Sequence, residues 1–488
     1  MNMQTNRMRR TACLTIAFLL CLTAAVLPGC SGQGEGAASS DVSSSADNSF
    51  PSQDVTLGGD VDILATTTEP VDQTTAGDTE PTVTQGPSGT DDPYASIPAS
   101  LKGSTVRMLL WYQPPENEKK AIRDFTAKTD IKVETKIAVG TGPYREMIAT
   151  SLAADEGYDV AMMNPTDFPS MVREALQPMN DIATFNADDP AWDKQIMNAY
   201  AVGGKYYGVN IRGNWQNDRV AMVYNKTMFE DRGVKTPRDY WKENNWNWDT
   251  FLEAAKAMTF TENGQTVYGY AQYTPNSIYY WPLSAGLDFV SFDGSQFTSN
   301  LSNPTLIKSL QFVADLSQKH KVQDAAYPYG IDAFRSGSAA MTSVITYVYK
   351  KDSTNFSGMT DEIDAVPFPS PKGSKACVPA VSKLFGILTK AKNPEAAVYW
   401  LRYFLDPCNY DMDAVFINKN LKDSFTAMNT MEHAYMYSEG VIAYGGLTDY
   451  GNMNNLIALT NSAQIAAKLK SYESIYSASI SKANRAVS

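Results

Sequence analysis

The stretch AMVYNKTMF, residues 221–229 of this 488-residue chain, joins a buried strand to a helix. Its opening residues are apolar or aromatic, and Asn225-Lys226 then turns the chain into the next helix. A second stretch, FRSGSAAM, follows at residues 334–341. We expect Phe334, Ala340 and Met341 to lie in the core, so both stretches maintain the fold more than they contact a ligand.

Around these stretches, predicted strands alternate with amphipathic helices. Residues 131–137 alternate strictly between apolar and polar side chains, which indicates a strand. Asn303-Pro304 and Asn393-Pro394 each predict an N-cap with proline at the first helical position. The pattern as a whole favours an α/β fold. Further strands are predicted at Thr105–Trp111 and Tyr158–Met163, and helices after Pro114-Pro115 and over Tyr144–Leu152.

Several landmarks follow one another in a fixed order. They are Tyr207-Gly208-Val209-Asn210, residues 221–229, Trp248-Asp249-Thr250-Phe251, residues 334–341, residues 363–369 and residues 392–397. This order resembles the extracellular solute-binding proteins of ABC importers, in the sugar-binding group related to maltose-binding protein. The resemblance covers roughly residues 104–488.

The resemblance implies two α/β lobes, joined by a multi-strand hinge, that close on a ligand held in a cleft. The first lobe is expected to contain residues 101–217 with about 384–430. The second is expected to contain residues 218–383 with about 431–488. The chain should cross between the lobes near residues 214–219 and again near residues 377–384.

Ligands of open α/β sheets bind beyond the carboxyl ends of the strands. Sugars need flat aromatic faces for their C–H surfaces and polar side chains for their hydroxyls. The resemblance adds Tyr347, which matches the position of an aromatic platform. Core packing is the alternative role for Trp111, and a helix N-cap is the alternative for Asp167. The candidate ligand-binding residues are Trp111, Tyr112, Asn164, Asp167, Asn214, Trp215, Tyr280, Trp281, Tyr347 and Tyr444.

The N-terminus has the pattern of an export signal. Arg7, Arg9 and Arg10 precede an apolar run that ends in Leu-Pro-Gly-Cys at Cys30. That quartet resembles a bacterial lipobox, so residues 1–29 are interpreted as a lipoprotein signal peptide and Cys30 as the lipidated residue. We therefore expect the protein to be lipid-anchored on the extracellular face of the cytoplasmic membrane.

Residues 30–100 have the composition of a disordered stalk. Residues 31–100 contain twelve acidic residues and no Lys or Arg, and they are rich in Ser, Thr, Gly and Pro. Without these acids and the three signal arginines, 38 basic and 41 acidic residues remain, a net charge of −3. The acidity of the chain thus comes mainly from the stalk, and the composition offers no basic patch for nucleic acid.

Catalytic and metal motifs are missing from the sequence. Its two histidines, His320 and His433, lie far apart, and no nucleophile elbow, phosphate loop or zinc motif occurs. We therefore expect neither catalysis nor a cofactor. Cys377 and Cys408 either form one disulfide or remain free thiols.

The sequence thus predicts a monomeric binding protein that delivers an oligosaccharide to an ABC permease. Two alternatives stay open. One is a surface glycosidase or polysaccharide-anchoring lipoprotein, and the other is a binding protein for a non-sugar solute such as a peptide, a polyamine or a metal complex.

Overall fold

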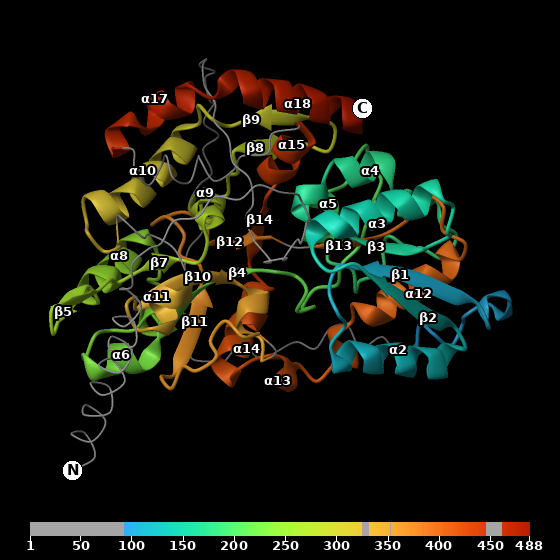
Figure 1. The fold of residues 1–488 in the computed structure, drawn as a ribbon, viewed down its shortest axis with the longest axis horizontal. Helices are drawn as coiled ribbons and strands as arrows, with labels where there is room; N and C mark the ends of the chain where they lie inside the picture. Colours follow the sequence, from blue (N-terminus) through green and yellow to red (C-terminus); the bar gives the residue numbers. More distant parts are fainter. Residues whose placement is uncertain (1–91, 325–330, 352, 382, 446–460) are drawn as a thin grey trace, which may run out of the picture. The chain divides into compact units, whose positions relative to one another are not determined.

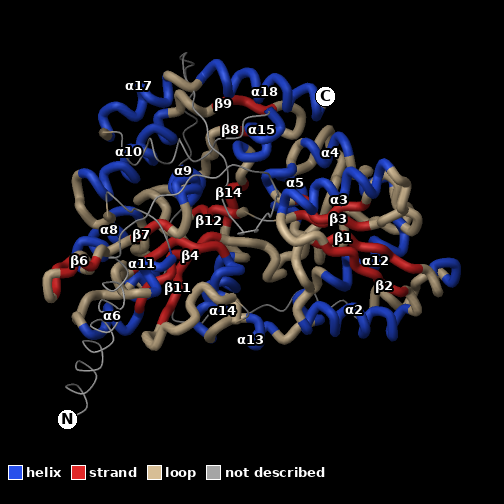
Figure 2. Tube along the Cα trace, viewed as in Figure 1, coloured by secondary structure: helices blue, strands red, loops and turns tan. Residues whose placement is uncertain are grey.

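The computed structural model describes residues 92–324, 331–351, 353–381, 383–445 and 461–488. Cys30, the predicted signal peptide and most of the predicted stalk lie outside the described residues. Within them the chain forms the expected mixture of strands and helices (Figures 1 and 2).

The first lobe is built on a sheet with the strand order β13-β3-β1-β2. β1 is parallel to β2 and β3, whereas β13 is antiparallel to β3. Phe125 on α2 and Trp400 on α12 are fully buried, with ring centroids 5.2 Å apart, and they pack these helices together beside β1. The strands are β1 Thr105–Leu110, β2 Lys132–Ile137, β3 Val160–Met163 and β13 Leu384–Ile387. The helices are η1 Ala99–Leu101, α2 Glu116–Thr129, α3 Thr141–Ala153, η2 Pro165–Asp167, α4 Ser170–Glu174, η3 Met179–Asp181, α5 Lys194–Ala199 and α12 Pro394–Phe404.

The second lobe is built on a sheet with the order β11-β4-β10-β7. Its strand β4 is buried at every position, and Asn225 accepts a hydrogen bond from the Met228 N–H to begin α6, as predicted. The strands are β4 Val220–Asn225, β5 Phe260–Glu262, β6 Gln265–Val267, β7 Ala271–Gln272, β8 Val290–Phe292, β9 Phe297–Ser299, β10 Met341–Ile345 and β11 Ile363–Pro367. The helices are α6 Lys226–Asp231, α7 Pro237–Lys242, α8 Trp248–Ala257, η4 Pro275–Tyr279, α9 Tyr280–Ser284, α10 Pro304–Gln318, α11 Ile331–Arg335 and η5 Thr346–Tyr349.

Three connections lie between the two sheets. Residues 212–219 lead from the first sheet to β4, and β12 (Cys377–Ala380) precedes β13. β12 pairs in parallel with β14 (Glu432–Tyr435) to form a small separate sheet. The third connection follows α12 and includes η6 (Pro407–Asn409) and α13 (Met412–Val415).

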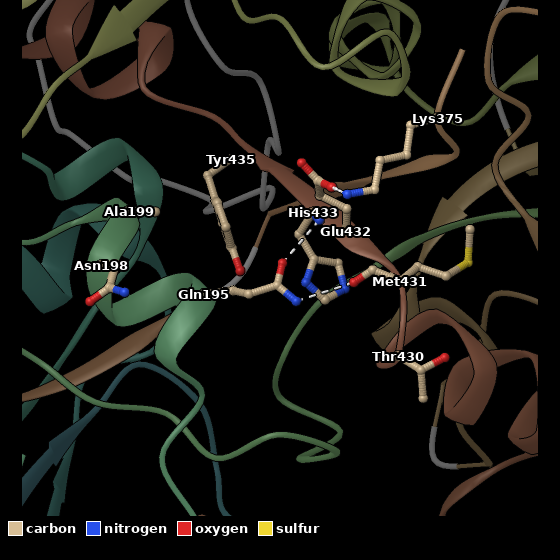
Figure 3. A pocket seen from close by; sticks show the side chains of 9 residues that line it. All are labelled: Gln195, Asn198, Ala199, Lys375, Thr430, Met431, Glu432, His433 and Tyr435. Atoms are coloured by element: carbon tan, nitrogen blue, oxygen red, sulfur yellow. Dashed lines mark hydrogen bonds and ion pairs between the residues drawn. The ribbon is translucent and has the colours of Figure 1, made fainter. Parts of the chain in front are cut away.

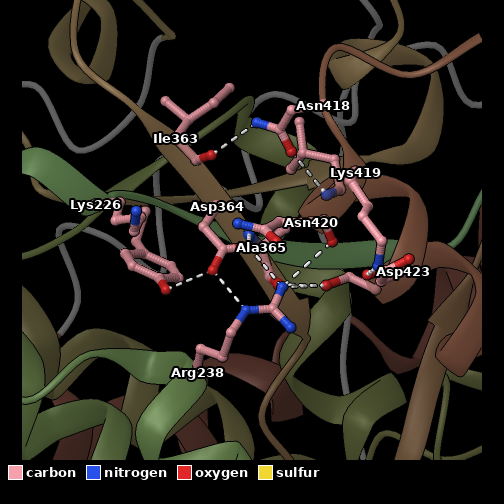
Figure 4. A network of polar contacts seen from close by, with 12 residues as sticks. Lys226, Arg238, Ile363, Asp364, Ala365, Asn418, Lys419, Asn420 and Asp423 are labelled. Atoms are coloured by element: carbon pink, nitrogen blue, oxygen red, sulfur yellow. Dashed lines mark hydrogen bonds and ion pairs between the residues drawn. The ribbon is translucent and has the colours of Figure 1, made fainter. Parts of the chain in front are cut away.

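Helix α14 (Lys419–Met428) corrects the expected lobe boundary. It falls within residues 384–430, which the sequence analysis placed in the first lobe, yet it packs against β11 of the second. Arg238 explains this placement, because it forms a two-bond ion pair with the buried Asp364 on β11 and also donates to the Asn420 carbonyl at 3.2 Å (Figure 4). Asn418 donates to the Ile363 carbonyl at 3.0 Å. The chain therefore returns to the second lobe soon after α12.

The C-terminal helices contact both lobes, whereas the sequence analysis assigned them to the second. They are α15 (Ser438–Gly445), η7 (Ser462–Gln464), α17 (Ile465–Lys470) and α18 (Glu473–Val487). α15 packs on η2, and α18 packs on both α4 and β9. The approach at Gly440 is so close that a Cβ atom there would lie 1.8 Å from the Phe168 carbonyl oxygen. Only glycine fits this position without moving the backbone.

The start of the described chain also differs from expectation. The predicted stalk extends to residue 100, but the Tyr94 ring lies 5.5 Å from that of Tyr403 and 6.4 Å from that of Phe125, measured between ring centroids. Asp92 pairs with Lys128 at 2.9 Å. Residues 92–100 are therefore part of the first lobe, because the Tyr94 ring and the buried Ile97 side chain pack against its core.

Two smaller expectations are settled by local contacts. Asn303 caps α10 through the Thr305 N–H, but Asn393 makes no side-chain cap and instead donates to the Thr105 carbonyl at 3.0 Å. Cys377 is buried and Cys408 exposed, and both are free thiols.

Candidate ligand-binding site

Two exposed apolar side chains mark the carboxyl ends of the two sheets. Among the described residues, Val139 and Tyr347 are the large hydrophobic side chains with high exposure, 68% and 40% respectively. Val139 follows β2 of the first lobe, and Tyr347 follows β10 of the second. Exposed apolar groups at sheet ends are where an open α/β fold places its ligand.

The segment that crosses between the lobes at residues 212–219, called the crossing segment below, contacts both of these sheet ends. The Gln216 side-chain amide donates to the Tyr112 hydroxyl at 3.1 Å and to Glu118 at 3.0 Å. Two residues later, Asp218 accepts from the Tyr347 backbone N–H at 3.2 Å and pairs with Lys383. Residues 216–218 thus join the end of β1 in the first lobe to the end of β10 in the second.

A pair of tyrosines forms the apolar surface of the second lobe. The Tyr273 hydroxyl lies 3.0 Å from the Tyr347 hydroxyl, and it also donates to Asn355 at 3.4 Å. Tyr273 directly follows β7, the strand next to β10. The two rings therefore come from neighbouring strand ends and are fixed to each other by their hydroxyl groups.

Three buried polar atoms near these sheet ends have no hydrogen-bond partner among the described residues. They are Trp111 Nε1 after β1, Asn217 Oδ1 in the crossing segment and Gln272 Oε1 in β7. Most buried polar atoms in proteins are paired with protein groups or with water. These three atoms are therefore available to a ligand or to bound water, and they offer one donor and two acceptors.

Asn164 and Asp167 are engaged with each other rather than left open. Asp167 accepts from both the backbone and the side-chain amide of Asn164 at 2.9 Å. Asn164 is the N-cap of η2 and Asp167 its third residue, so Asp167 completes a capping box rather than serving as the N-cap itself. Arg145 on α3 pairs with Asp167 at 2.5 Å and donates to Thr166 at 2.9 Å. Its side chain is 45% exposed, so Arg145 is the group that this cluster presents to solvent.

Four predicted site residues are buried in packing roles. Trp281 is fully buried among aromatic rings, including Phe251 at 5.0 Å and Phe368 at 4.8 Å, and a stacking role does not fit there. Trp215 packs edge-on against Tyr410 at 4.0 Å. The remaining two are Asn214, whose amide donates to the Leu405 carbonyl at 2.5 Å, and Tyr280, which is 5% exposed and packs near Phe368.

The other predicted residues keep some exposure. Trp111 and Tyr112 are half-buried at the end of β1, and Tyr347 is exposed after β10. Tyr444 is also half-buried, but Lys482 of α18 lies over its ring at 4.9 Å, away from the strand ends discussed here.

Sequence reasoning missed several residues at these sheet ends: Val139, Arg145, Asp218, Tyr273 and Gln272. The same rule that selected Trp111 would have found Val139, because it follows a predicted strand. Tyr273 and Gln272 gave no such signal, since β7 is two residues long and shows no periodicity. Arg145 lies on a helix, 22 positions from the carboxylate that it contacts.

Within the described ranges, no group of three or more His, Cys, Asp or Glu side chains is placed to hold a metal ion. His433 is committed to Arg219, whose Nε–H lies 2.9 Å from its Nε2. This arrangement suits non-covalent binding by aromatic faces and hydrogen bonds.

A family comparison agrees with this geometry. The model for bacterial extracellular solute-binding proteins matches residues 113–409, more than half of the chain. The chain belongs to this family. Comparison with curated proteins gives no match.

Solved structures of two-lobed solute-binding proteins share the fold. A cyclic α-maltosyl-1,6-maltose binding protein from Arthrobacter globiformis has a TM-score of 0.57 at 16% identity, covering 78% of this chain and 98% of that one. An ABC substrate-binding protein from Listeria monocytogenes, in complex with cycloalternan, has a TM-score of 0.54 at 16% identity over the same shares. A maltose/maltodextrin-binding domain from Bdellovibrio bacteriovorus, bound to maltotriose, has a TM-score of 0.53 at 14% identity, with shares of 78% and 99%. The two-lobed α/β fold predicted from the sequence is thereby confirmed.

Proposed function

We propose that this solute-binding protein captures a carbohydrate, most simply an oligosaccharide, in a cleft between its lobes. The observation that carries this proposal is the tyrosine pair Tyr273–Tyr347 at the strand ends of the second lobe, together with Trp111 after β1 of the first lobe, which offers a ring and an unpartnered indole N–H. Aromatic faces with convergent polar groups are typical of sites for small molecules with both C–H and hydroxyl surfaces. The ligands named for the three solved structures are oligosaccharides, which supports the same class here.

In this proposal, Tyr347, Tyr273 and Trp111 contact the sugar rings. Arg145, Gln272 and Asn217 form hydrogen bonds with sugar hydroxyls. Because the ligand touches both lobes, it binds the closed arrangement better and shifts the population toward it. In this proposal the protein binds the sugar without converting it, which its membership of the solute-binding family supports.

The proposal extends to the compartment and the partner. The lipobox-like quartet at Cys30 supports a lipid anchor, and residues 31–91 supply a stalk to the membrane surface. In the part of the chain that the structure describes, no helix combines the length and apolar character needed to span a bilayer. The closed, loaded protein then passes its sugar to the permease subunits of an ABC importer.

Titration calorimetry over a panel of mono- and oligosaccharides tests the proposal, with product analysis on the same samples. Heat of binding with unchanged sugar supports a binding protein. Cleavage of the sugar would support the glycosidase alternative. Binding of a peptide or polyamine, with no response to any sugar, would overturn the ligand class.

A further inference from the structure

A cavity lies between α5 of the first lobe and the small β12–β14 sheet. It has a volume of about 710 Å³ (Figure 3). Its lining residues are Gln195, Asn198, Ala199, Lys375, Thr430, Met431, Glu432, His433 and Tyr435. Neither Trp111 nor the tyrosine pair belongs to it.

Two buried polar atoms of this lining have no hydrogen-bond partner among the described residues. They are His433 Nδ1 and the Tyr435 hydroxyl. The two residues are 8% and 7% exposed, and both side chains leave β14 on the side to which the Gln195 side chain of α5 reaches (Figure 3). They are two positions apart on one strand, so they lie on the same face of it.

The contacts of His433 show which ring nitrogen carries its proton. The Arg219 Nε–H points at His433 Nε2 at 2.9 Å, and an arginine nitrogen can only donate. His433 Nε2 must therefore accept, although the Met428 carbonyl oxygen also lies 2.9 Å from it. The ring is neutral, because burial and then the charge of Arg219 lower the pKa of His433 to about 3. Its proton thus sits on Nδ1, a buried donor that lacks an acceptor.

The surrounding groups define what an occupant must offer. Gln195 accepts from the backbone N–H of His433 and donates one amide hydrogen to the Met431 carbonyl, both at 3.2 Å, which leaves its second amide hydrogen. Asn198 Oδ1 already accepts from the Tyr206 hydroxyl, which leaves its NH₂ group. The open groups are thus donors, the His433 Nδ1–H and the remaining amide hydrogens, together with the Tyr435 hydroxyl, which can donate or accept.

Charge on the lining is balanced. Lys375 and Glu432 pair with each other at the rim, and Arg219 pairs with Asp193 at 3.2 Å beneath His433. An anion would meet the Glu432 carboxylate at the rim, whereas hydroxyl oxygens accept from the open donors and hydroxyl protons are donated to Glu432. We propose that this cavity is a second binding site, for a small uncharged polyhydroxyl compound whose oxygens accept hydrogen bonds from His433 Nδ1 and the Tyr435 hydroxyl. This site goes beyond the proposed function and does not depend on it.

The chain offers a direct probe, because it contains only two histidines. Histidine-selective ¹⁵N labelling of the whole protein, with His320→Gln for assignment, gives one signal that reports on His433. We expect titration with myo-inositol to shift the His433 Nδ1–H signal with saturation and to leave the His320 signal in place. An unchanged His433 signal at concentrations that fill a millimolar site would overturn the proposal.

A matched pair of variants tests the hydroxyl. Tyr435→Phe keeps the ring and removes the oxygen, and we expect myo-inositol to bind about tenfold more weakly, as for the loss of one hydrogen bond. Tyr472→Phe removes another buried hydroxyl without a described partner, outside this cavity, and should leave the titration unchanged. Equal effects of the two variants would contradict the assignment.

The ligand class is tested with succinate. A His433 shift with succinate and none with myo-inositol would overturn the polyhydroxyl class. Calorimetry with oligosaccharides, run in parallel, measures binding at the sheet ends. Failure of the sugar-binding proposal is therefore distinguishable from failure of the proposed site beside His433.

Discussion

Asp218 accepts a hydrogen bond from the backbone N–H of Tyr347 at 3.2 Å. Asp218 lies in the segment that crosses between the lobes, and Tyr347 is the second residue of η5, the turn after β10. The same carboxylate pairs with Lys383, just before β13 of the first lobe. The exposed ring of Tyr347 is thus anchored to two of the connections between the lobes, and its position should depend on how the lobes are arranged.

Replacement of Tyr347 tests its role in ligand binding. We expect Tyr347→Ala to weaken sugar binding by about 2 kcal/mol or more, because it removes an aromatic contact surface. The ring is 40% exposed, so the free energy of unfolding without ligand should change little. Calorimetry and chemical denaturation measure the two quantities. Tyr347→Phe, which retains the ring and loses only the contact with the Tyr273 hydroxyl, is the conservative comparison, and full affinity in both variants would remove Tyr347 from the site.

Trp281 should respond in the opposite way. Because its ring is fully buried among Phe251, Phe312 and Phe368, we expect Trp281→Ala to lower the free energy of unfolding by about 3–5 kcal/mol. Trp241→Ala, at a half-buried position on α7, should cost less. Normal stability with lost sugar affinity in Trp281→Ala would instead return Trp281 to the ligand site.

The close contact at Gly440 predicts a steric effect. In Gly440→Ala the new methyl group would collide with the carbonyl oxygens of Phe168 and Pro165, so α15 must move away from η2. We expect a loss of about 1–3 kcal/mol in the free energy of unfolding. Gly142→Ala is the control, because it lies in α3 with open space around its Cα and should be neutral or stabilising by up to about 1 kcal/mol. Equal stabilities of the two variants would show that the contact is not tight in solution.

His433 predicts a pH dependence of stability. Its folded-state pKa is about 3, below the ordinary value of 6.5, chiefly because of burial. Between these values the unfolded chain binds the proton more readily, so the contribution of His433 is present above pH 6.5 and is lost as the pH falls through this window, at up to about 1.4 kcal/mol per pH unit.

We therefore expect the stability difference between the wild type and His433→Gln to narrow from pH 7 to pH 4. Asp288 changes the stability in the opposite direction with pH, because burial raises its pKa to about 6. Its effect is the same in both proteins, so it cancels in the difference between them. Denaturation curves at several pH values measure the difference, and parallel pH profiles for the two proteins would contradict the buried, neutral state of His433.

Local patterns predicted strands of both sheets well. Strict alternation over residues 131–137 corresponds to β2, and the apolar run before Asn225 corresponds to β4. These signals succeed because they depend on neighbours along the chain. Asn393 shows the limit of such local prediction. It was expected to cap a helix, but its side chain donates to the Thr105 carbonyl, 288 positions away in the sequence.

The candidate site was harder to predict for the same reason. Trp111 and Trp281 both follow apolar segments, and only the packing of other helices decides that Trp281 is enclosed while Trp111 keeps some exposure. The placement of α14 similarly depends on Arg238, which lies 182 positions before the Asn420 carbonyl that it contacts. Such long-range contacts leave no periodic mark in the sequence.

The packing of Tyr94 against Phe125 and Tyr403 has a mechanical consequence. Any force transmitted along the chain from its N-terminal side enters the folded body through the first lobe, at α2 and α12. If Cys30 is anchored as proposed, the stalk holds the first lobe, and the second lobe moves relative to it. The hinge would then carry no load from the anchor, and opening would stay independent of tension in the stalk.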